Sequence, residues 1–243
     1  MINVWNWRTG IKVASNKNTQ KVNALCFAPD SSHAVSVGFR HVRFWYLQIP
    51  QRGPGGAPHE AVPLTGKIAP LGDIQNNNFA CSVYPDEKTL VSVTYSGILC
   101  QFNADNRQLL NSVTIPTKRA YCMAANYDDG LLYVGCANGT IRIYNGASLD
   151  YVGMLPRPHK LGVDLTAPMT DTSYVYGEEP DVQVCADTIA ITWLGDSMMA
   201  ACYSDHSIYV WDVSDLDRVV KSASWLFHSS KIWGIDVSYK HKL

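Results

Sequence analysis

Short runs of apolar residues at every second position recur along the chain, and each run ends at an aromatic residue. These aromatic residues are Trp5 (MINVW), Trp45 (RHVRFW), Phe102 (GILCQF), Tyr144 (GTIRIY) and Trp211 (HSIYVW). Alternation with a period of two is typical of half-buried strands, and Gly, Asn, Asp and Pro residues mark the turns between the runs. Almost no stretch has the helical period of 3.6 residues. The pattern therefore predicts an all-β protein.

The spacing of the aromatic residues predicts a repeat. Trp45 follows Trp5 by 40 residues and Tyr144 follows Phe102 by 42, whereas the other two intervals are 57 and 67 residues long. A period of about 40–45 residues is that of a WD-type propeller blade. The two longer intervals hold a segment rich in Pro and Gly at 48–63 and an irregular segment at 155–182. We expect both to be loop insertions, which in such arrays often lie on a binding face.

Four passes along the chain share one order of elements: an inner strand, a polar turn, a strand of small residues, a second turn and the aromatic-ended strand. Small residues (VSVG, VSVT, VGCA, AACY) let neighbouring sheets approach closely, and the aromatic residue fills the wider space between them. Residues 1–243 are thus predicted to form an incomplete WD-repeat β-propeller. We expect about four full four-stranded blades, boundaries near 20, 70, 118 and 183, and partial blades at both ends, with KIWGIDV (231–237) as a last inner strand.

Composition narrows the classes of function. The net charge is −1 and 17% of the residues are charged, so the chain lacks the basic excess that nucleic-acid binding needs. Its seven cysteines include no CxxC pair, and we expect buried free thiols in a reducing compartment, cytosol or nucleus. No secretory signal precedes the first strand, and no apolar run reaches the ~18 residues that span a bilayer. We therefore expect neither nucleic acid nor membrane as a partner.

Catalytic chemistry finds little support in the sequence. No histidine pair has metal-ligand spacing, there is no GxSxG elbow, and no glycine-rich loop follows a strand and opens a helix. Acidic pairs such as Asp128–Asp129 fall in predicted turns, where solvated charges are the ordinary interpretation. We predict a protein that is not an enzyme and that takes no metal, cofactor or small-molecule substrate.

Several stretches resemble one WD-repeat family. The segments VSVGFRHVRFWYL, LPRPHKLGVDL and YSDHSIYVWDV, within a region from Ile2 to about Val237, are similar to the family of mitogen-activated protein kinase-binding protein 1 and WD repeat-containing protein 62. The resemblance implies a segment of a large cytoplasmic scaffold with two tandem propellers. Such scaffolds bring together components of the c-Jun N-terminal kinase pathway, and at least one branch works at spindle poles and centrosomes.

In a WD-type blade, the Asp of the turn before the aromatic strand accepts hydrogen bonds from a Ser or Thr, a His and the Trp of the strand. By this resemblance Asp205 and Trp211 take structural places, and Trp45 takes the Trp place in an earlier blade. Asp212 ends its strand, and His228 is a candidate for the His place in the following blade. We expect these residues to stabilise the fold and not to perform chemistry.

The loops suggest a protein-binding patch. Arg40, His41, Arg157, His159 and Lys160 precede aromatic strands or follow an outer one. If the turns before aromatic strands and the loops that enter inner strands share one face, these cations form a shallow patch for an acidic or phosphorylated peptide. The alternative is a scattered set of solvated charges.

Three functions remain open at this stage. The first is a protein-interaction platform in a kinase-signalling or spindle-pole scaffold, in the cytoplasm and at spindle poles or centrosomes. The second is a generic WD-repeat adaptor with unrelated partners, for instance in ubiquitin ligation or trafficking. The third is a propeller enzyme, which needs titratable groups that converge at one mouth of the propeller.

Overall fold

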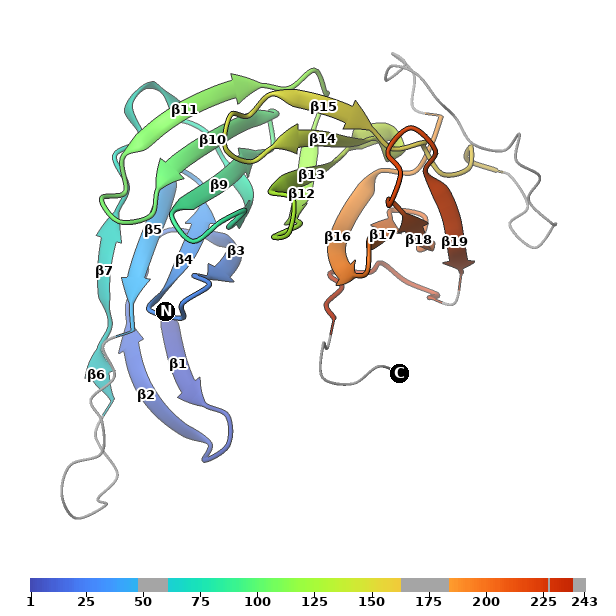
Figure 1. Cartoon of the computed structure of the whole chain (residues 1–243). Helices are drawn as coiled ribbons and strands as arrows, with labels where there is room; N and C mark the ends of the chain where they lie inside the picture. Colours follow the sequence, from blue (N-terminus) through green and yellow to red (C-terminus); the bar gives the residue numbers. More distant parts are fainter. Residues whose placement is uncertain (48–60, 163–183, 227, 238–243) are drawn as a thin grey trace.

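A computed structural model describes residues 1–47, 61–162, 184–226 and 228–237. Four antiparallel four-stranded sheets follow one another along a curve (Figure 1). The first two sheets comprise β3 (Val22–Phe27), β4 (His33–Gly38), β5 (His41–Tyr46) and β7 (Thr65–Ile68), then β8 (Phe79–Val83), β9 (Thr89–Thr94), β10 (Ile98–Asn103) and β11 (Leu109–Thr114). The other two comprise β12 (Ala120–Ala125), β13 (Leu131–Cys136), β14 (Ile141–Asn145) and β15 (Tyr151–Met154), then β16 (Thr188–Gly195), β17 (Met198–Tyr203), β18 (Ile208–Asp212) and β19 (Val220–Trp225).

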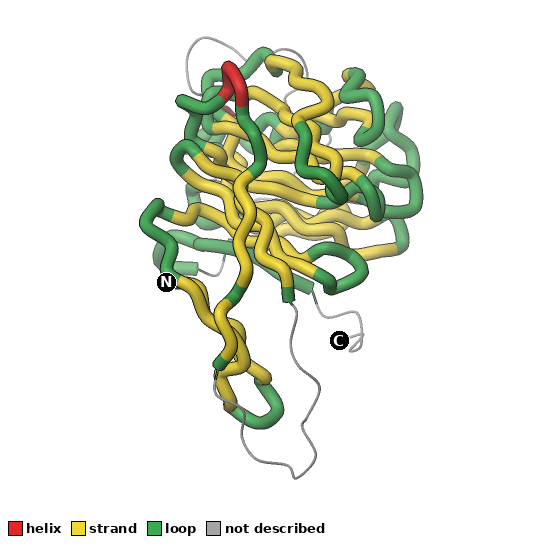
Figure 2. Tube along the Cα trace, turned by 90° about the vertical axis from the view of Figure 1, so that its left-hand side faces the viewer, coloured by secondary structure: helices red, strands yellow, loops and turns green. Residues whose placement is uncertain are grey.

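A smaller sheet precedes these four. The antiparallel pair β1 (Ile2–Asn6) and β2 (Ile11–Asn16) is joined in parallel by the two-residue strand β6 (Val62–Pro63). This sheet projects from one end of the array (Figure 2). Two short 3₁₀ turns, η1 (Gly72–Ile74) and η2 (Ala137–Gly139), complete the elements of the described ranges, which contain no α-helix. No helical segment there is long and apolar enough to cross a bilayer.

Burial within each sheet follows strand position. The second strands β4, β9, β13 and β17 are buried almost throughout, on both faces. The outer strands β7, β11, β15 and β19 are mostly exposed or half-buried. Small residues on the second strands permit close approach, as Gly135 shows: a Cβ there would meet the Sγ atom of Cys122 and lie 2.9 Å from Cγ2 of Thr188 in the next sheet. The expected role of the small-residue strands is therefore confirmed.

The aromatic residues that end the third strands fill the spaces between sheets. Trp45, Phe102, Tyr144 and Trp211 are each at most 2% exposed. Each belongs to an apolar cluster that joins its own sheet to the preceding one, so the core consists of successive inter-sheet layers and not of one central mass. The prediction of an all-β fold with WD-type blades is confirmed.

Trp5, at the equivalent place in β1, is 57% exposed. In the other four sheets a strand like β4 pairs with the aromatic strand and helps to cover the aromatic residue. Among the described residues, β1 pairs only with β2, so no such strand covers Trp5. The inner strand β3 was expected to be mostly buried, but Leu25 and Phe27 are 54% and 65% exposed. No described sheet packs over that side of β3.

Two local predictions were wrong. Residues 231–237 form no strand, and Trp233 is 91% exposed, because no strand of the described ranges pairs with this segment. The segment 48–63 was expected to be loop throughout, yet Val62 and Pro63 pair with β2. The rest of that segment (48–60) and most of the segment 155–182 (163–182) lie outside the described residues.

All seven cysteines are free thiols. Five are buried and two, Cys26 and Cys81, are half-buried, which agrees with the expectation that they pack as small apolar residues. Burial raises the pKa of Cys26 to about 12 and that of Cys202 to about 11, so these thiols are poor nucleophiles at neutral pH.

Candidate protein-interaction face

The turns that precede the aromatic strands and the connections that enter the inner strands lie on one face of the array, which we name the turn face. Backbone hydrogen bonds join these turns to the connections, either within one sheet or between neighbouring sheets. They run from the Arg40 N–H to the Asn77 carbonyl (2.9 Å), from the Ala137 N–H to the Arg119 carbonyl (2.8 Å) and from the Ser204 N–H to the Asp187 carbonyl (2.9 Å). The turns and the connections thus share one face, whereas the cationic patch on it stays a prediction.

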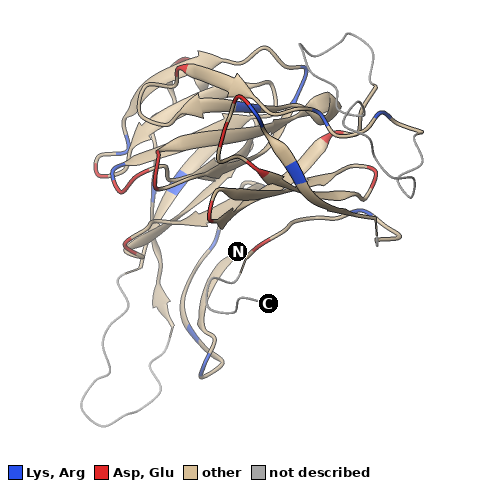
Figure 3. Cartoon of the chain, turned by 45° about the vertical axis from the view of Figure 1, so that its right-hand side comes forward, with Lys and Arg blue, Asp and Glu red and all other residues tan. Residues whose placement is uncertain are grey.

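The remaining turns lie on the opposite face. There the Ala104 N–H donates to the Lys88 carbonyl (2.8 Å) and the Val213 N–H donates to the Ser197 carbonyl (2.9 Å). Since strands alternate in direction, the two kinds of turn are separated by the length of a strand. Basic and acidic residues are interspersed along the array (Figure 3).

Of the five predicted patch residues, only Arg40 and Lys160 are exposed. Arg40 occupies the β4–β5 turn with a left-handed backbone (φ 60°), and Lys160 forms an isolated β-bridge with Cys185 where the chain leads towards β16. The other three are at most 3% exposed. The β4–β5 turn and the connection after β15 belong to sheets separated by the β8–β11 sheet, so the five residues do not form one contiguous cluster.

His41 is buried beside the turn that carries Arg40. Its Nδ1 atom lies 3.5 Å from the Phe39 carbonyl oxygen, and burial lowers the pKa of its imidazole. The buried imidazole packs beneath the β4–β5 turn and contacts the backbone of Phe39 in that turn. Any contribution of His41 to binding is therefore indirect.

His159 belongs to a buried polar network. Its Nε2 atom lies 2.6 Å from Oδ2 of Asp205, and its Nδ1 atom lies 2.7 Å from the hydroxyl of Tyr209. Because a carboxylate only accepts, the Nε2–H donates to Asp205; in the neutral imidazole, Nδ1 then accepts from the hydroxyl of Tyr209. Ser207 donates to the other carboxylate oxygen of Asp205 from both its hydroxyl (2.7 Å) and its N–H (3.1 Å).

This network differs from the predicted one in its partners. The Nε1–H of Trp211 donates to the hydroxyl of Tyr203 at 3.1 Å, and in the first full sheet the Nε1–H of Trp45 donates to Oγ of Ser36 at 2.8 Å. His159 supplies the imidazole that pairs with Asp205, while His228, considered for such a place, is exposed. Asp212 accepts from the Ser214 N–H (3.0 Å), which turns the chain away from β18.

An aromatic and cationic group that the sequence does not reveal lies at the centre of the turn face. The guanidinium of Arg119 lies 5.2 Å from the ring centroid of Tyr95 and 5.7 Å from that of Tyr121. The hydroxyl of Tyr121 donates to Oδ2 of Asp187 at 2.8 Å, and the N–H of Asn138 donates to Oδ1 at the same distance. The sequence Arg119–Tyr121 (RAY) is typical of the start of a strand. Arg119 lies between Tyr95 and Tyr121 only because their two sheets are neighbours.

These features suit protein recognition better than catalysis. Tyr and Arg are enriched at the centres of protein interfaces, and Phe39, 52% exposed, adds apolar surface beside Arg40. Within the described ranges, no group of three His, Cys, Asp or Glu side chains has a geometry that would hold a metal ion. The exposed acidic residue Asp73 also lies in a connection on this face, so the face is mixed in charge and cationic mainly around Arg119.

Comparison with known proteins agrees with the architecture. Residues 107–145 match the family described as WD domain, G-beta repeat. Over 235 residues the chain is 40% identical to WD repeat-containing protein 62 of Mus musculus and 39% identical to mitogen-activated protein kinase-binding protein 1 of the same species. It is 38% identical over 241 residues to the human form of the latter. Each match covers 95% of this chain and 15% of the relative.

The similarity thus spans nearly the whole chain but only a small part of the relatives. It includes all four four-stranded sheets and the turn face that they build. The chain is therefore a WD-repeat segment homologous to part of WD repeat-containing protein 62 and mitogen-activated protein kinase-binding protein 1.

Proposed function

We propose that this chain is a non-enzymatic protein-interaction platform, part of a cytoplasmic scaffold that acts in c-Jun N-terminal kinase signalling, in spindle-pole organisation, or in both. The observation that carries the proposal is the turn face. Hydrogen-bonded turns and connections hold Arg40 next to the exposed Phe39 and hold Arg119 against the rings of Tyr95 and Tyr121. Rigid aromatic and guanidinium groups lose little conformational entropy when a partner binds.

The relatives support the class of partner. One is named as a binding protein of mitogen-activated protein kinase, and 39% identity over 95% of this chain makes a shared binding surface a reasonable proposal. In this proposal Arg40 and Lys160 contact the partner, whereas His41, Arg157 and His159 hold the turns in place. The partner is a protein; neither a cofactor nor a small-molecule substrate is part of the proposal.

Proximity labelling in dividing cells tests the proposal. The chain is fused to a biotin ligase, and the labelled proteins are compared with those labelled by the ligase alone. Recovery of c-Jun N-terminal kinase pathway members or spindle-pole proteins supports the scaffold function. A different reproducible set contradicts it and favours the second candidate, a generic WD-repeat adaptor with unrelated partners in ubiquitin ligation or trafficking.

A further inference from the structure

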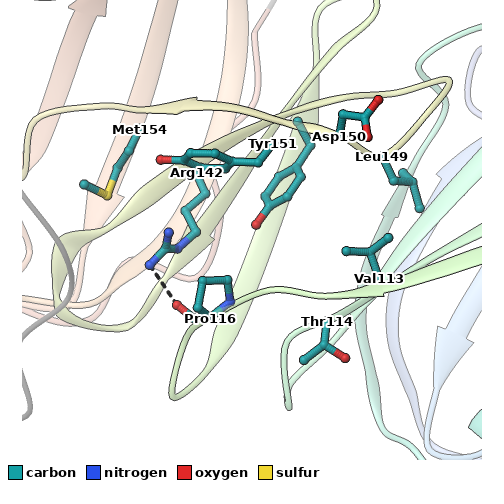
Figure 4. A pocket seen from close by; sticks show the side chains of 9 residues that line it. Val113, Thr114, Pro116, Arg142, Leu149, Asp150, Tyr151 and Met154 are labelled. Atoms are coloured by element: carbon teal, nitrogen blue, oxygen red, sulfur yellow. Dashed lines mark hydrogen bonds between the residues drawn. The ribbon is translucent and has the colours of Figure 1, made fainter.

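A cavity of about 440 Å³ lies on the outer side of the array, between β11 of one sheet and β14–β15 of the next (Figure 4). It is separate from the turn-face residues described above. Most of its wall is apolar or aromatic, contributed by Val113, Pro116, Tyr144, Leu149, Tyr151 and Met154. Thr114, Arg142 and Asp150 complete the lining.

Arg142 points into this cavity between Pro116 and Met154 (Figure 4). The residue is 7% exposed, and its Nη2 atom donates to the carbonyl oxygen of Pro116 at 2.8 Å. Its Nε atom has no hydrogen-bond partner, and no carboxylate of the described residues lies within 4.0 Å of the guanidinium. Buried cations in proteins are ordinarily paired with an anion, since leaving one unpaired is costly.

Arg43 occupies the position in β5 that Arg142 occupies in β14, and its contacts provide a comparison. It precedes Trp45 by two residues, as Arg142 precedes Tyr144, and its Nη1 atom donates to Oδ1 of Asn18 at 3.2 Å. Its guanidinium also lies 5.2 Å from the ring centroid of Trp45. The Nε atom of Arg43 is likewise unpaired, so the difference is in the acceptor: Arg43 has a side-chain acceptor from its own protein, and Arg142 has only a backbone carbonyl.

A second donor faces the same space. Tyr144, 2% exposed, also lines the cavity, and its phenol is a second hydrogen-bond donor there. Burial raises the pKa of Tyr144 to about 12, although Arg142 lowers it, so the phenol keeps its proton at neutral pH. A guanidinium and a phenol that line a mostly apolar cavity suit an anionic group.

The charge of the cavity selects the kind of anion. One guanidinium balances one negative charge, and Asp150, exposed at the other end of the cavity, repels a second (Figure 4). A carboxylate is a monoanion at neutral pH, whereas a phosphomonoester carries about −1.5 to −2 charges. The apolar wall then accommodates the aliphatic neighbours of an acidic side chain.

We propose that this cavity binds a Glu or Asp side chain of a partner peptide, with its carboxylate on the guanidinium of Arg142 and its apolar neighbours against Pro116, Tyr151 and Met154. The lining of the cavity contains none of Arg40, Arg119 and Lys160, so the inference does not depend on the proposed function. It adds an outer docking site to the platform.

A peptide titration tests the proposal on the whole chain. The probes are acetyl-Leu-Glu-Leu-amide, its Gln analogue and its phosphoserine analogue, and binding is followed through the ¹³C-methyl NMR signal of Met154. We expect the Glu peptide to shift this signal and to bind at least about tenfold more tightly than the Gln peptide, because it gains a charge-assisted hydrogen bond. Equal binding of the two, or no shift of the Met154 signal with either, overturns the proposal.

Variants provide the controls. Arg142→Gln is expected to remove the preference for Glu over Gln, and Asp150→Asn, at an exposed position, is expected to keep it and to tighten binding of the Glu peptide. If Arg142→Gln fails to fold, the peptide comparison on the natural chain and on Asp150→Asn still decides. Tighter binding of the phosphoserine peptide than of the Glu peptide also contradicts a carboxylate site.

Discussion

The Nε2 atom of His159 lies 2.6 Å from the Oδ2 atom of Asp205, which is 46 residues further along the chain. This contact joins the connection after β15 to the turn between β17 and β18, and thus two neighbouring sheets. Because His159 is 3% exposed, its imidazole depends on Asp205 and Tyr209 for its hydrogen bonds.

Asp205→Ala should lower the free energy of unfolding by about 1–3 kcal/mol, since it leaves a buried imidazole nitrogen without its acceptor. Asp217→Ala, at an exposed position of the β18–β19 turn, is the matched control and should change it by less than about 0.5 kcal/mol. Urea denaturation followed by tryptophan fluorescence measures both. Equal stability of the two variants would show that the contact contributes nothing.

Two serines at equivalent places should respond differently to truncation. The Oγ atom of Ser36 accepts a hydrogen bond from the indole of Trp45. Ser92 occupies the equivalent position in the second full sheet, where Phe102 takes the place of the tryptophan. The buried Oγ of Ser92 has no hydrogen-bond partner among the described residues. Ser36→Ala should therefore cost about 1–3 kcal/mol, because the indole N–H loses its acceptor. Ser92→Ala should be neutral or stabilising. Thermal denaturation of the two variants makes the comparison, and a larger loss for Ser92→Ala refutes it.

Glycines of the third full sheet offer a test of close packing. Gly135→Ala should destabilise by about 1–3 kcal/mol, since its Cβ would overlap Cys122 and crowd Thr188 of the next sheet. Gly153→Ala in β15 meets no atom within 4 Å and is the control. Chemical denaturation should leave Gly153→Ala close to the natural chain. If Gly135→Ala is equally well tolerated, the sheets pack less closely than described.

Stability should fall as the pH decreases through about 6.5. Burial lowers the pKa values of His33 and His41 below the ordinary 6.5, so between the folded and unfolded pKa values the unfolded chain binds more protons. The contribution is fully present above pH 6.5 and is lost towards the lower folded pKa. The free energy of unfolding should therefore be smaller at pH 5.5 than at pH 8, and His33→Gln should reduce this difference. His228→Gln, at an exposed position, should not.

Asp205 acts in a separate, more acidic range. Burial by itself raises the pKa of its carboxyl, but hydrogen bonds from His159 and Ser207 outweigh burial, and the net pKa lies below the ordinary 3.8. Its contribution to stability is present above pH 3.8 and is lost as the pH falls through the lower folded value. The loss near pH 6 thus belongs to the histidines.

The strands that the sequence predicted are those with a buried face. The alternation of apolar and polar residues revealed β5, β10, β14 and β18, because their aromatic ends and apolar residues face a neighbouring sheet. Outer strands such as β11 and β19 have too few buried positions to show a period of two. The segment 231–237 has the alternation of a strand but no neighbour to pair with, which a local pattern does not reveal.

The site was less predictable than the fold. Nothing in LPRPHKL distinguishes a buried imidazole from a surface cation. His159 contacts Asp205, which is 46 residues further along the chain, and no local pattern predicts that contact. Arg119 was overlooked because its partners Tyr95 and Tyr121 come together only across two sheets. Exposed contact residues carry no periodicity, so only the order of the blades brings them to one face.

The central claim is that the turn face captures protein partners. In the proximity-labelling experiment, the variant Arg40→Glu, Arg119→Glu, Lys160→Glu is compared with Arg8→Glu, Lys88→Glu, Arg218→Glu, which reverses three exposed cations in turns of the opposite face. Both variants carry the same net charge. We predict that the first loses most of the proteins labelled by the natural chain and that the second retains them. Equal retention by the two variants would contradict the turn face as the interaction surface.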